Sequence, residues 1–418
     1  MFIFLCYIIL SPIIFGLIIF SSIFNAKIRS HLLDARKSVR LAKSKIDLSA
    51  KDKKIILFHA ASAGEYEQLK PILKEIDSAK YFVLLTFFSP TIFKKEKYSQ
   101  LADAVCYHPF DLPWSAILFF IRLKPQKYII TRHDIWPFHL YFARLMGIQT
   151  IFINANLYLN SSRFNFGLTS FNRWVFHQFD LILTGSETLK NTILSLAPKS
   201  TVKITGDSRF DQVIQRSRNS RRDLLPSIFQ SSKNIILGST VSSDLPILSQ
   251  TFDALGENFF GADIRLIIVP HELGNSNLLQ LEKLLLEKDL SYKRITEFKE
   301  FDSPQVLIVN KVGILADLYA SAKIAYIGAG FSSGVHSVIE PAVHKCAVVY
   351  GPRVDILDEA VEMTQIGAGL MIHNGIELAE FFQKISHLPE IEKLGNRAYE
   401  FIIEKEYAST RIINEIFS

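Results

Sequence analysis

The sequence predicts two Rossmann-like α/β domains preceded by a membrane-spanning helix. The chain has 418 residues, which is too long for one hydrophobic core. Apolar, strand-like runs alternate with helix-period patterns from Ile55 onward, and this alternation indicates βαβ units and parallel sheets. The first residues after the initiating methionine form a long uncharged segment. We therefore expect two α/β domains that face one another across a cleft.

The N-terminal segment predicts a single membrane span. Residues Phe2 to Phe24 contain no charged side chain, and 23 residues are enough to cross a bilayer as a helix. Pro12 and Gly16 are tolerated in such helices. A cleaved signal peptide is the alternative, but it would have a shorter apolar region, a basic segment before it and a small-residue cleavage site after it. We expect an anchor over residues 1–24.

A basic segment over residues 25–50 follows the expected anchor. It contains seven basic and two acidic side chains, namely Lys27, Arg29, Arg36, Lys37, Arg40, Lys43 and Lys45 against Asp34 and Asp47. The positive-inside rule places this flank, and the body of the protein after it, in the cytoplasm. The same charges would attract the body to anionic lipid headgroups.

Composition narrows the class of partner. The net charge of +6 suits anionic lipids or phosphorylated ligands. No RNA- or DNA-binding signature is present, so we expect no nucleic-acid partner. The three cysteines, Cys6, Cys106 and Cys346, are far apart in the sequence. This spacing argues against a disulfide framework or a zinc site and fits a reducing compartment.

The alternation of patterns sets the expected domain boundaries. The first domain covers residues 51–215, with strands at 55–60, 81–87, 128–131, 150–156 and 181–185. A polar, basic stretch predicts a linker over residues 216–232. The second domain covers residues 233–418, with strands at 234–240, 264–270, 306–310, 324–330 and 347–352. The last helix is a candidate to pack back on the first domain.

The segment from Ile55 to Leu73 carries the first candidate site. It reads as a buried strand, a turn of small residues and a helix that opens at Glu65. Open α/β sheets bind ligands at the carboxyl ends of their strands, where this turn lies. Ser62 and Gly64 have little bulk, so a substrate could approach the backbone closely. The alternative is structural, because Ser62 and Glu65 have the spacing of a capping box.

A Gly/Ser-rich loop in the second half carries the second candidate site. Gly328, Gly330, Ser333 and Gly334 follow a strand, and their amides could point at an anion with help from the next helix. Glu340 follows the loop and could bind both hydroxyls of a ribose. Tight turns use glycine as well, so the loop alone is a weak signal. His336 is either a phosphate contact or a polar loop residue.

Three further loops contain candidate ligands. Ser239 and Thr240 follow strand 234–237 and suit phosphate or sugar, although turn formation or helix capping explains them equally well. His271 lies in the loop Pro270–Glu272, which follows strand 264–269 at the same edge of the sheet. Arg209 stands at the domain junction, where it could contact a phosphate or form a salt bridge.

The motifs in this order resemble the Kdo transferases of lipopolysaccharide synthesis, which transfer 3-deoxy-D-manno-octulosonic acid (Kdo). The similar segments are HAASAGE (59–65), TRHDIWP (131–137), GDSRFD (206–211), GST (238–240), PHE (270–272) and IEPA (339–342). The resemblance implies a GT-B fold and inverting transfer of Kdo from CMP-Kdo to a lipid A precursor, lipid IVA. It also implies no metal and no cofactor, and a site on the cytoplasmic face of the bacterial inner membrane, in contact with its lipids.

The resemblance also assigns roles to residues. Glu65 would be the base that deprotonates the acceptor hydroxyl. The Gly328–Gly334 loop, with Ser239, Thr240 and His336, would bind the donor nucleotide; Arg209 and His271 are candidates for the donor phosphate or carboxylate, and Glu340 for its ribose. For the acceptor we expect Ser62 and Gly64, with Arg163, Arg173 and Trp174 in an aromatic and basic stretch that suits a phosphorylated acyl lipid. Ordinary helix core is the alternative for that stretch and for residues 113–124.

Departures from the family pattern affect individual contacts. Arg132 and His133 stand where the family often has an acidic residue, and in Asn154-Ala155-Asn156 an asparagine stands where it commonly has arginine. The segment 270–272 lacks an arginine of the family motif, and Val335 and Ser337 alter another. A GT-B transferase that uses a UDP-sugar, a sugar-nucleotide epimerase and a catalytically idle membrane protein remain alternatives. Ligand protection by CMP against UDP distinguishes the first of these.

Overall fold

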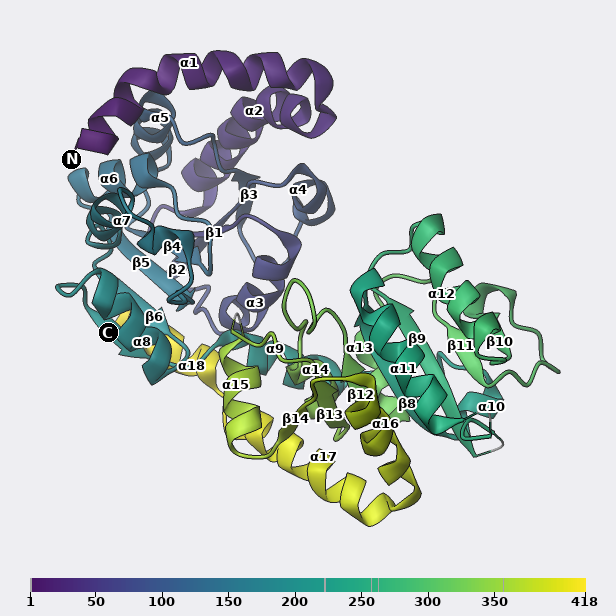
Figure 1. The fold of residues 1–418 in the computed structure, drawn as a ribbon. Helices are drawn as coiled ribbons and strands as arrows, with labels where there is room; N and C mark the ends of the chain where they lie inside the picture. The colour runs from purple at the N-terminus through teal and green to yellow at the C-terminus, as the bar shows by residue number, and fades with distance from the viewer. Residues whose placement is uncertain (1, 222, 257, 262, 356) are drawn as a thin grey trace. The chain divides into compact units, whose positions relative to one another are not determined.

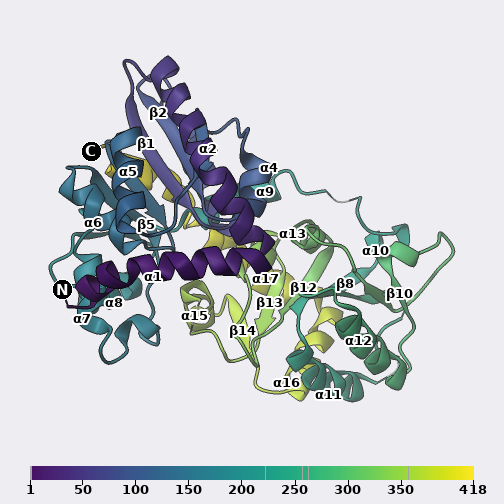
Figure 2. The ribbon, with the colours of Figure 1, turned by 90° about the horizontal axis from the view of Figure 1, so that it is seen from above.

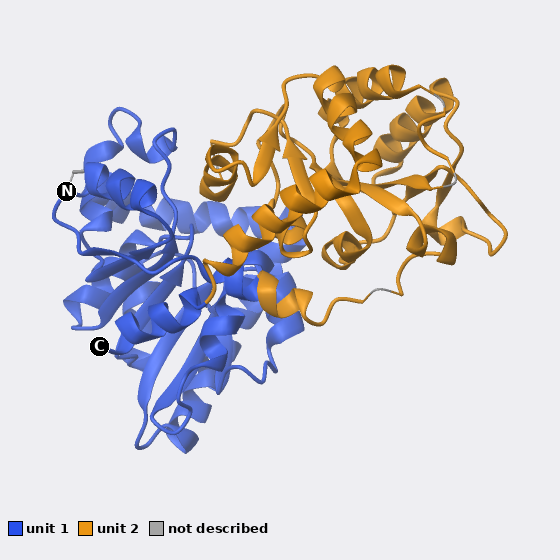
Figure 3. Ribbon diagram, turned by 90° about the horizontal axis from the view of Figure 1, so that it is seen from below, with its two compact units in different colours: residues 1–212, 407–418 blue, residues 213–406 orange. Residues whose placement is uncertain are grey.

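The computed structural model describes residues 2–418 except 222, 257, 262 and 356. The chain forms two compact units (Figure 3). Unit 1 comprises Met1–Gln212 together with Tyr407–Ser418, and unit 2 comprises Val213–Glu406. The end of the chain therefore belongs to the first unit.

Unit 1 is built on a seven-stranded parallel sheet with the order β3-β2-β1-β4-β5-β6-β7. Its strands are almost continuous apolar runs, as expected of a sheet covered on both faces. Chain order reverses between β1 and β4, which are hydrogen-bonded neighbours. In such sheets this reversal opens a crevice for a ligand. The strands are β1 (Lys54–Ala60), β2 (Tyr81–Phe87), β3 (Ala104–Tyr107), β4 (Lys127–Thr131), β5 (Gln149–Ala155), β6 (Leu181–Thr184) and β7 (Val202–Ile204).

Helices cover both faces of this sheet (Figure 1). They are α3 (Ala63–Lys74), α4 (Pro90–Glu96), α5 (Pro113–Leu123), α6 (Pro137–Leu145), the short η1 (Ser162–Phe164), α7 (Thr169–Phe176), α8 (Glu187–Leu196), α9 (Ser208–Ser217) and α18 (Ala408–Phe417). The last helix, α18, returns from the far end of the chain. Its Ile412 and Ile416 are fully buried in the same core as β1 and β2. Apolar burial therefore fixes the C-terminus to unit 1.

Helix α1 (Phe2–Phe24) is long and apolar enough to cross a membrane. Among the described residues, no other helix meets this condition. Its first turns pack on the rest of unit 1. The Phe4 ring lies 4.4 Å from Trp174 and 5.1 Å from Phe138, and the Tyr7 hydroxyl donates to the carbonyl oxygen of Asp111 at 3.0 Å. The rest of α1 exposes large apolar side chains, namely Leu5, Ile9, Leu10, Ile13, Leu17, Ile19, Phe20, Ile23 and Phe24.

The basic segment is a helix of unit 1, α2 (Ala26–Ser49), which the sequence did not reveal. Asn25 caps it by accepting from the amides of Lys27 and Ile28. One face is buried on the unit and the opposite face carries most of the basic side chains; the buried residues are His31, Ser38, Val39, Ala42 and Ile46. The basic side chains are therefore displayed on one side of a packed helix.

Unit 2 also has a seven-stranded parallel sheet, with the order β10-β11-β9-β8-β12-β13-β14 (Figure 1). Figure 2 shows its strands β14, β13, β12 and β8 in this order. Chain order reverses between β8 and β12. The strands are β8 (Lys233–Thr240), β9 (Ile264–Pro270), β10 (Tyr292–Arg294), β11 (Val306–Ile308), β12 (Ala322–Ile327), β13 (Ala347–Tyr350) and β14 (Gly369–Met371). The helices are α10 (Ser227–Gln230), α11 (Leu245–Leu255), α12 (Asn275–Glu287), α13 (Leu315–Leu318), α14 (Ile339–Val343), α15 (Asp358–Gln365), α16 (Gly375–Gln383) and α17 (Leu388–Ile403), with short turns η2 (Ser242–Asp244), η3 (Ile295–Glu297), η4 (Tyr319–Ser321) and η5 (Lys384–Ser386).

All ten expected strands exist, and those at 81–87 and 264–270 have the expected bounds. The sequence missed four short strands, β3, β7, β10 and β14, each of three or four residues. Helix α3 begins at Ala63, two residues before the expected start. The polar stretch 216–232 contains the end of α9 and all of α10, whose Phe229 is buried.

Candidate active site

The candidate catalytic residue lies at the strand reversal of unit 1. Glu65 is in the first turn of α3, which follows β1, while the segment Arg132–Trp136 follows β4. Because β1 and β4 are adjacent and parallel, both segments leave the same edge of the sheet at neighbouring positions.

Glu65 also takes part in capping α3. The Ser62 hydroxyl accepts from the Glu65 amide at 3.3 Å, and the Glu65 carboxylate accepts from the Ala61 amide at 2.6 Å. The capping interpretation is therefore confirmed, with the carboxylate reaching one residue beyond the usual partner. Glu65 is only 6% exposed, and this burial raises the pKa of its carboxyl group. The Ala61 amide and nearby His59 oppose the shift, whereas Asp134 adds to it.

His59, Asp134 and Trp136 form a hydrogen-bonded group beside Glu65. The Trp136 Nε1–H lies 3.1 Å from both His59 Nε2 and Asp134 Oδ2. The Thr86 hydroxyl donates to the Phe58 carbonyl oxygen, so it accepts from His59 Nδ1 at 3.1 Å. These partners place a proton on His59 Nδ1, while Nε2 faces the Trp136 N–H and Asp134. The sequence reading missed Asp134 as a site residue; its place two residues before Trp136 was the available signal.

Three arginines lie near the segment Arg132–Trp136 or within it. Arg209 Nε lies 2.8 Å and Arg132 Nη1 lies 3.4 Å from Asp207 Oδ2, and Arg163 Nη2 donates to the His133 carbonyl oxygen at 3.2 Å. We call Arg132, Arg163 and Arg209 the arginine cluster. The sequence predicted Arg163 and Arg209 for different substrates, but the structure brings both to one edge of unit 1. Arg132 was not predicted as a ligand.

The remaining acceptor candidates lie outside the arginine cluster. Arg173 Nε donates to the Leu196 carbonyl oxygen at 2.9 Å, which directs it toward α8. The Trp174 ring packs against Phe4 and Tyr141, so the core alternative explains it. Gly64 has open space where a side chain would be, within the first turn of α3.

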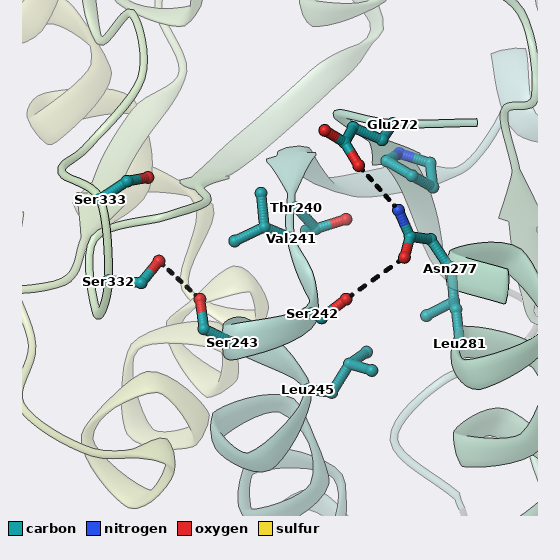
Figure 4. Close-up of a pocket in the computed structure, with 11 residues that line it drawn as sticks. Thr240, Val241, Ser242, Ser243, Leu245, Glu272, Asn277, Leu281, Ser332 and Ser333 are labelled. Carbon is teal, nitrogen blue, oxygen red and sulfur yellow. Dashed lines mark hydrogen bonds between the residues drawn. The ribbon is translucent and has the colours of Figure 1, made fainter. Parts of the chain in front are cut away.

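Unit 2 has a pocket of about 330 Å³ beside its own strand reversal (Figure 4). Thr240 and Ser333, two of the predicted donor ligands, line it. Hydrogen bonds link Ser243 to Ser332 at 2.7 Å and Asn277 to Glu272 at 3.1 Å, as the dashed lines show. The full lining is Thr240, Val241, Ser242, Ser243, Leu245, Pro270, Glu272, Asn277, Leu281, Ser332 and Ser333.

The glycines of the Gly/Ser-rich loop have a packing role. A Cβ on Gly328 would lie 2.4 Å from the Ser239 carbonyl oxygen, and one on Gly330 would lie 2.6 Å from the Gly351 amide nitrogen. Gly334 adopts a φ of 109°, which side-chain-bearing residues rarely adopt. Helix α14 begins only at Ile339 and has five residues. Its dipole is therefore a weaker aid to anion binding than the sequence suggested.

Two histidines stack near this loop. The ring centroids of His271 and His336 are 4.3 Å apart and the rings are nearly parallel. His336 Nε2 is buried without a hydrogen-bond partner among the described residues, and burial together with His271 lowers the pKa of His336. Glu340 lies in the first turn of α14, where burial raises the pKa of its carboxyl group. Within the described part of the chain, no three His, Cys, Asp or Glu side chains are grouped as a metal ion would require.

Comparison with known proteins points to one family. Residues 34–212 match the family model described as 3-deoxy-D-manno-octulosonic-acid transferase (kdotransferase). The 3-deoxy-D-manno-octulosonic acid transferase of Aquifex aeolicus is 28% identical over 341 residues, which cover 80% of this chain and 86% of that protein. That of Chlamydia muridarum is 26% identical and covers 78% and 77%. Together these matches support the Kdo transferase family for this chain. They identify it as a glycosyltransferase.

Solved structures confirm the GT-B type of fold for this chain. A putative UDP-N-acetylglucosamine 2-epimerase from Listeria monocytogenes superposes with a TM-score of 0.65 at 11% identity, covering 87% of this chain and 96% of that one. The S. aureus protein MnaA, solved with UDP, gives 0.59 at 14% identity and covers 87% and 96%. At these identities the likeness concerns the fold alone. It supports the prediction of two parallel-sheet α/β domains.

Proposed function

We propose that this glycosyltransferase moves Kdo from CMP-Kdo to a lipid A precursor, lipid IVA, at the cytoplasmic face of a bacterial inner membrane. The observation that carries the proposal is the buried carboxyl group of Glu65 at the strand reversal of unit 1, in a chain that matches the Kdo transferase family. The names of the curated relatives support Kdo as the transferred sugar.

The proposed reaction needs one base. The acceptor hydroxyl oxygen attacks the anomeric carbon of Kdo, the bond from that carbon to the phosphate oxygen breaks, and CMP leaves with the bonding electrons. The hydroxyl proton passes to Glu65, and the configuration of the anomeric carbon is inverted. A raised pKa makes Glu65 a stronger base than an exposed glutamate, which suits it to this role.

We assign the donor to unit 2. Thr240 and Ser333 line its pocket and offer hydroxyl groups for phosphate or sugar. His271 and His336 present stacked imidazoles near the same edge, and Ser239 adopts a φ of 55° that turns the chain there. Glu340 keeps its proposed role at the ribose hydroxyls, and the amides of Gly328, Gly330 and Gly334 keep theirs at the phosphate.

We assign the acceptor to unit 1. Ser62 and Gly64 form the turn beside Glu65, and Arg163 lies near Asp134. Arg209 moves from the donor to the acceptor set, because Asp207 joins it to Arg132. Helix α1 would attach this unit to the membrane through its exposed apolar side chains, with the basic face of α2 beside the headgroups.

Product analysis tests this proposal. The full chain in detergent is incubated with CMP-Kdo and lipid IVA, and the products are resolved by mass spectrometry. We expect lipid IVA to gain one or more Kdo residues in the wild type, while Glu65→Gln, verified as folded by circular dichroism, forms almost none. CMP should protect the chain against thermal unfolding better than UDP. Protection by UDP alone, or wild-type turnover in Glu65→Gln, would contradict the donor or the base, respectively.

A further inference from the structure

The arginine cluster surrounds a single imidazole of unit 1. Arg132 Nε lies 3.2 Å from His133 Nε2, and Arg163 Nη2 donates to the His133 carbonyl oxygen at 3.2 Å. Arg209 is close enough to influence the pKa of His133. The three guanidinium groups come from three separate elements, namely the end of β4, η1 and the first turn of α9. Tertiary folding therefore brings them together, not proximity in the sequence.

The cluster is held in position by neighbouring side chains. The Asp207 side chain, 10% exposed, accepts from the backbone amide and Nε of Arg209, both at 2.8 Å, and from Arg132. Asn172 accepts from Arg163 Nη1 at 3.5 Å and donates to the Arg163 carbonyl oxygen at 3.1 Å. Arg132 adopts a φ of 66°, an unfavourable conformation that concentrates at functional sites. Such fixed side chains lose little entropy when they bind a ligand.

The charges in this region favour an anion. Arg132 and Arg209 share the carboxylate of Asp207. Arg163 is instead influenced by the charge of Asp134, which is itself shared with His59 and Trp136. The pKa of His133 falls to about 4 because of burial and the three arginines, and only Asp134 opposes this shift. The imidazole is therefore neutral at pH 7, although it lies beside a carboxylate.

We propose that Arg132, Arg163 and His133 bind a phosphate group of the acceptor. Arg209 and Asp207 hold Arg132 in position. The assignment to an acceptor rests on the proposed function, since unit 1 also carries Glu65. A phosphate monoester offers three terminal oxygens and nearly two negative charges, which suits guanidinium groups that approach from different elements. A carboxylate has two coplanar oxygens and engages one guanidinium fork best. The site would thus recognise acceptors by their phosphorylation.

Bound phosphate should change the protonation of His133. Its charge would offset that of the arginines, so the imidazole would take up part of a proton on binding below pH 6.5. The groups that face His133 are Arg132, Asp134, Arg163 and Arg209, and only Asp134 is negative. Sulfate is a useful probe here, because it does not titrate in this range. Calorimetry in two buffers of different ionisation enthalpy reports the number of protons taken up.

Asn156 offers a test of position as well as charge. Its Nδ2 lies 3.5 Å from His133 Nε2, the same atom that Arg132 Nε approaches from the adjacent strand end. The double variant Arg132→Asn with Asn156→Arg therefore moves one guanidinium group across the same imidazole. A merely structural role for Arg132 would not be rescued in this way.

The experiment measures binding of inorganic phosphate and sulfate to the full chain in detergent, without donor, at pH 5.5 and 7.5. We expect Arg132→Gln and Arg163→Gln to weaken binding roughly tenfold or more, since each removes a charge-assisted hydrogen bond. Arg173→Gln, which lies toward α8, should bind as the wild type does. The double variant should recover most of the affinity. His133→Asn should abolish proton uptake at pH 5.5.

Kinetics then identify the source of the phosphate group. The KM for lipid IVA should rise in Arg132→Gln, whereas the KM for a dephosphorylated acceptor should not change. Equal phosphate binding in wild type and Arg132→Gln, or stronger competition by free Kdo carboxylate than by phosphate, would overturn the assignment. If phosphate binding depends on Arg132 but lipid IVA is never glycosylated, the anion site stands and the proposed function fails.

Discussion

Asp211 offers a sharp test of how the C-terminus is held. Its carboxylate, in α9, accepts from the Tyr407 amide at 2.7 Å and the Ser409 amide at 2.6 Å, at the start of α18. The residue is 5% exposed. Because the first amides of a helix have no partner within it, this carboxylate caps α18 from a distant part of the sequence. Asp211→Ala would leave both amides without this acceptor.

The cost follows from the two bonds. A hydrogen bond to a charged group contributes about 1.5–3 kcal/mol, and two that share one carboxylate are not fully additive. We therefore expect Asp211→Ala to weaken docking of α18 by about 3 kcal/mol, or on the order of a hundredfold in its opening equilibrium. Ile412 and Ile416 remain buried and contribute about 1.5–3 kcal/mol each, so the helix should stay docked most of the time.

Native-state hydrogen exchange measures this opening. Amides of α18 should lose about a hundredfold in protection in Asp211→Ala, as the free-energy estimate requires, while amides of β4 keep theirs. Asp211→Asn is the matched control, because it retains one oxygen acceptor and should give an intermediate loss. Unchanged protection of α18 in Asp211→Ala would refute the assignment of the cap. Equal losses in α18 and β4 would instead show that α18 opens only when unit 1 unfolds.

Four further predictions concern activity and pH. Glu65→Gln should lower kcat by about 10²–10⁴. The wild-type rate should fall as the pH drops through the raised pKa of Glu65, because the protonated carboxyl group cannot accept a proton. The kcat–pH profiles of both proteins check this. Burial lowers the folded-state pKa of His31 to about 4. Its contribution to stability is therefore complete above pH 6.5 and is lost at up to about 1.4 kcal/mol per pH unit between pH 6.5 and 4. His31→Phe should flatten this pH dependence, as measured by the hydrogen-exchange stability of unit 1. Gly328→Ala would place a Cβ 2.4 Å from the Ser239 carbonyl oxygen and should abolish thermal protection by CMP while phosphate binding to unit 1 persists. EDTA should leave the transfer rate unchanged, and a loss restored by Mg²⁺ would contradict the metal-free reaction.

The sequence predicted the inner strands of both sheets because their side chains are buried on both faces. β2 and β9 are largely apolar, interrupted by Thr86 and Arg265 respectively, and their bounds were predicted to the residue. β7 and β14 have only three residues each and are partly exposed at the edges of their sheets, so no run of apolar side chains marks them. The helical character of α2 was hidden by its charge, although its buried positions recur every three or four residues.

The sequence predicted a candidate site residue only where that residue directly follows a strand. Glu65 follows β1 directly, so the position of the turn placed it at the edge of the sheet. The roles of His59 and Asp134 depend on the Trp136 side chain, which joins residues from β1 and from the segment after β4. The arginine cluster depends on three elements whose adjacency no local pattern shows. Contacts between distant segments were therefore the part that sequence reasoning could not supply.

The burial of Glu65 bears on its two interpretations, as a helix cap and as a base. Capping needs only an acceptor near the first amides of α3, and an exposed glutamate supplies it without loss of hydration. Glu65 is instead 6% exposed, and burial disfavours its charged form more than the Ala61 amide and His59 restore it. Capping alone does not explain this cost. The proposed role as a base would explain it, because the same burial that destabilises the carboxylate makes it more basic. The hydrogen bond to Ala61 would then hold the carboxylate at the edge of the sheet.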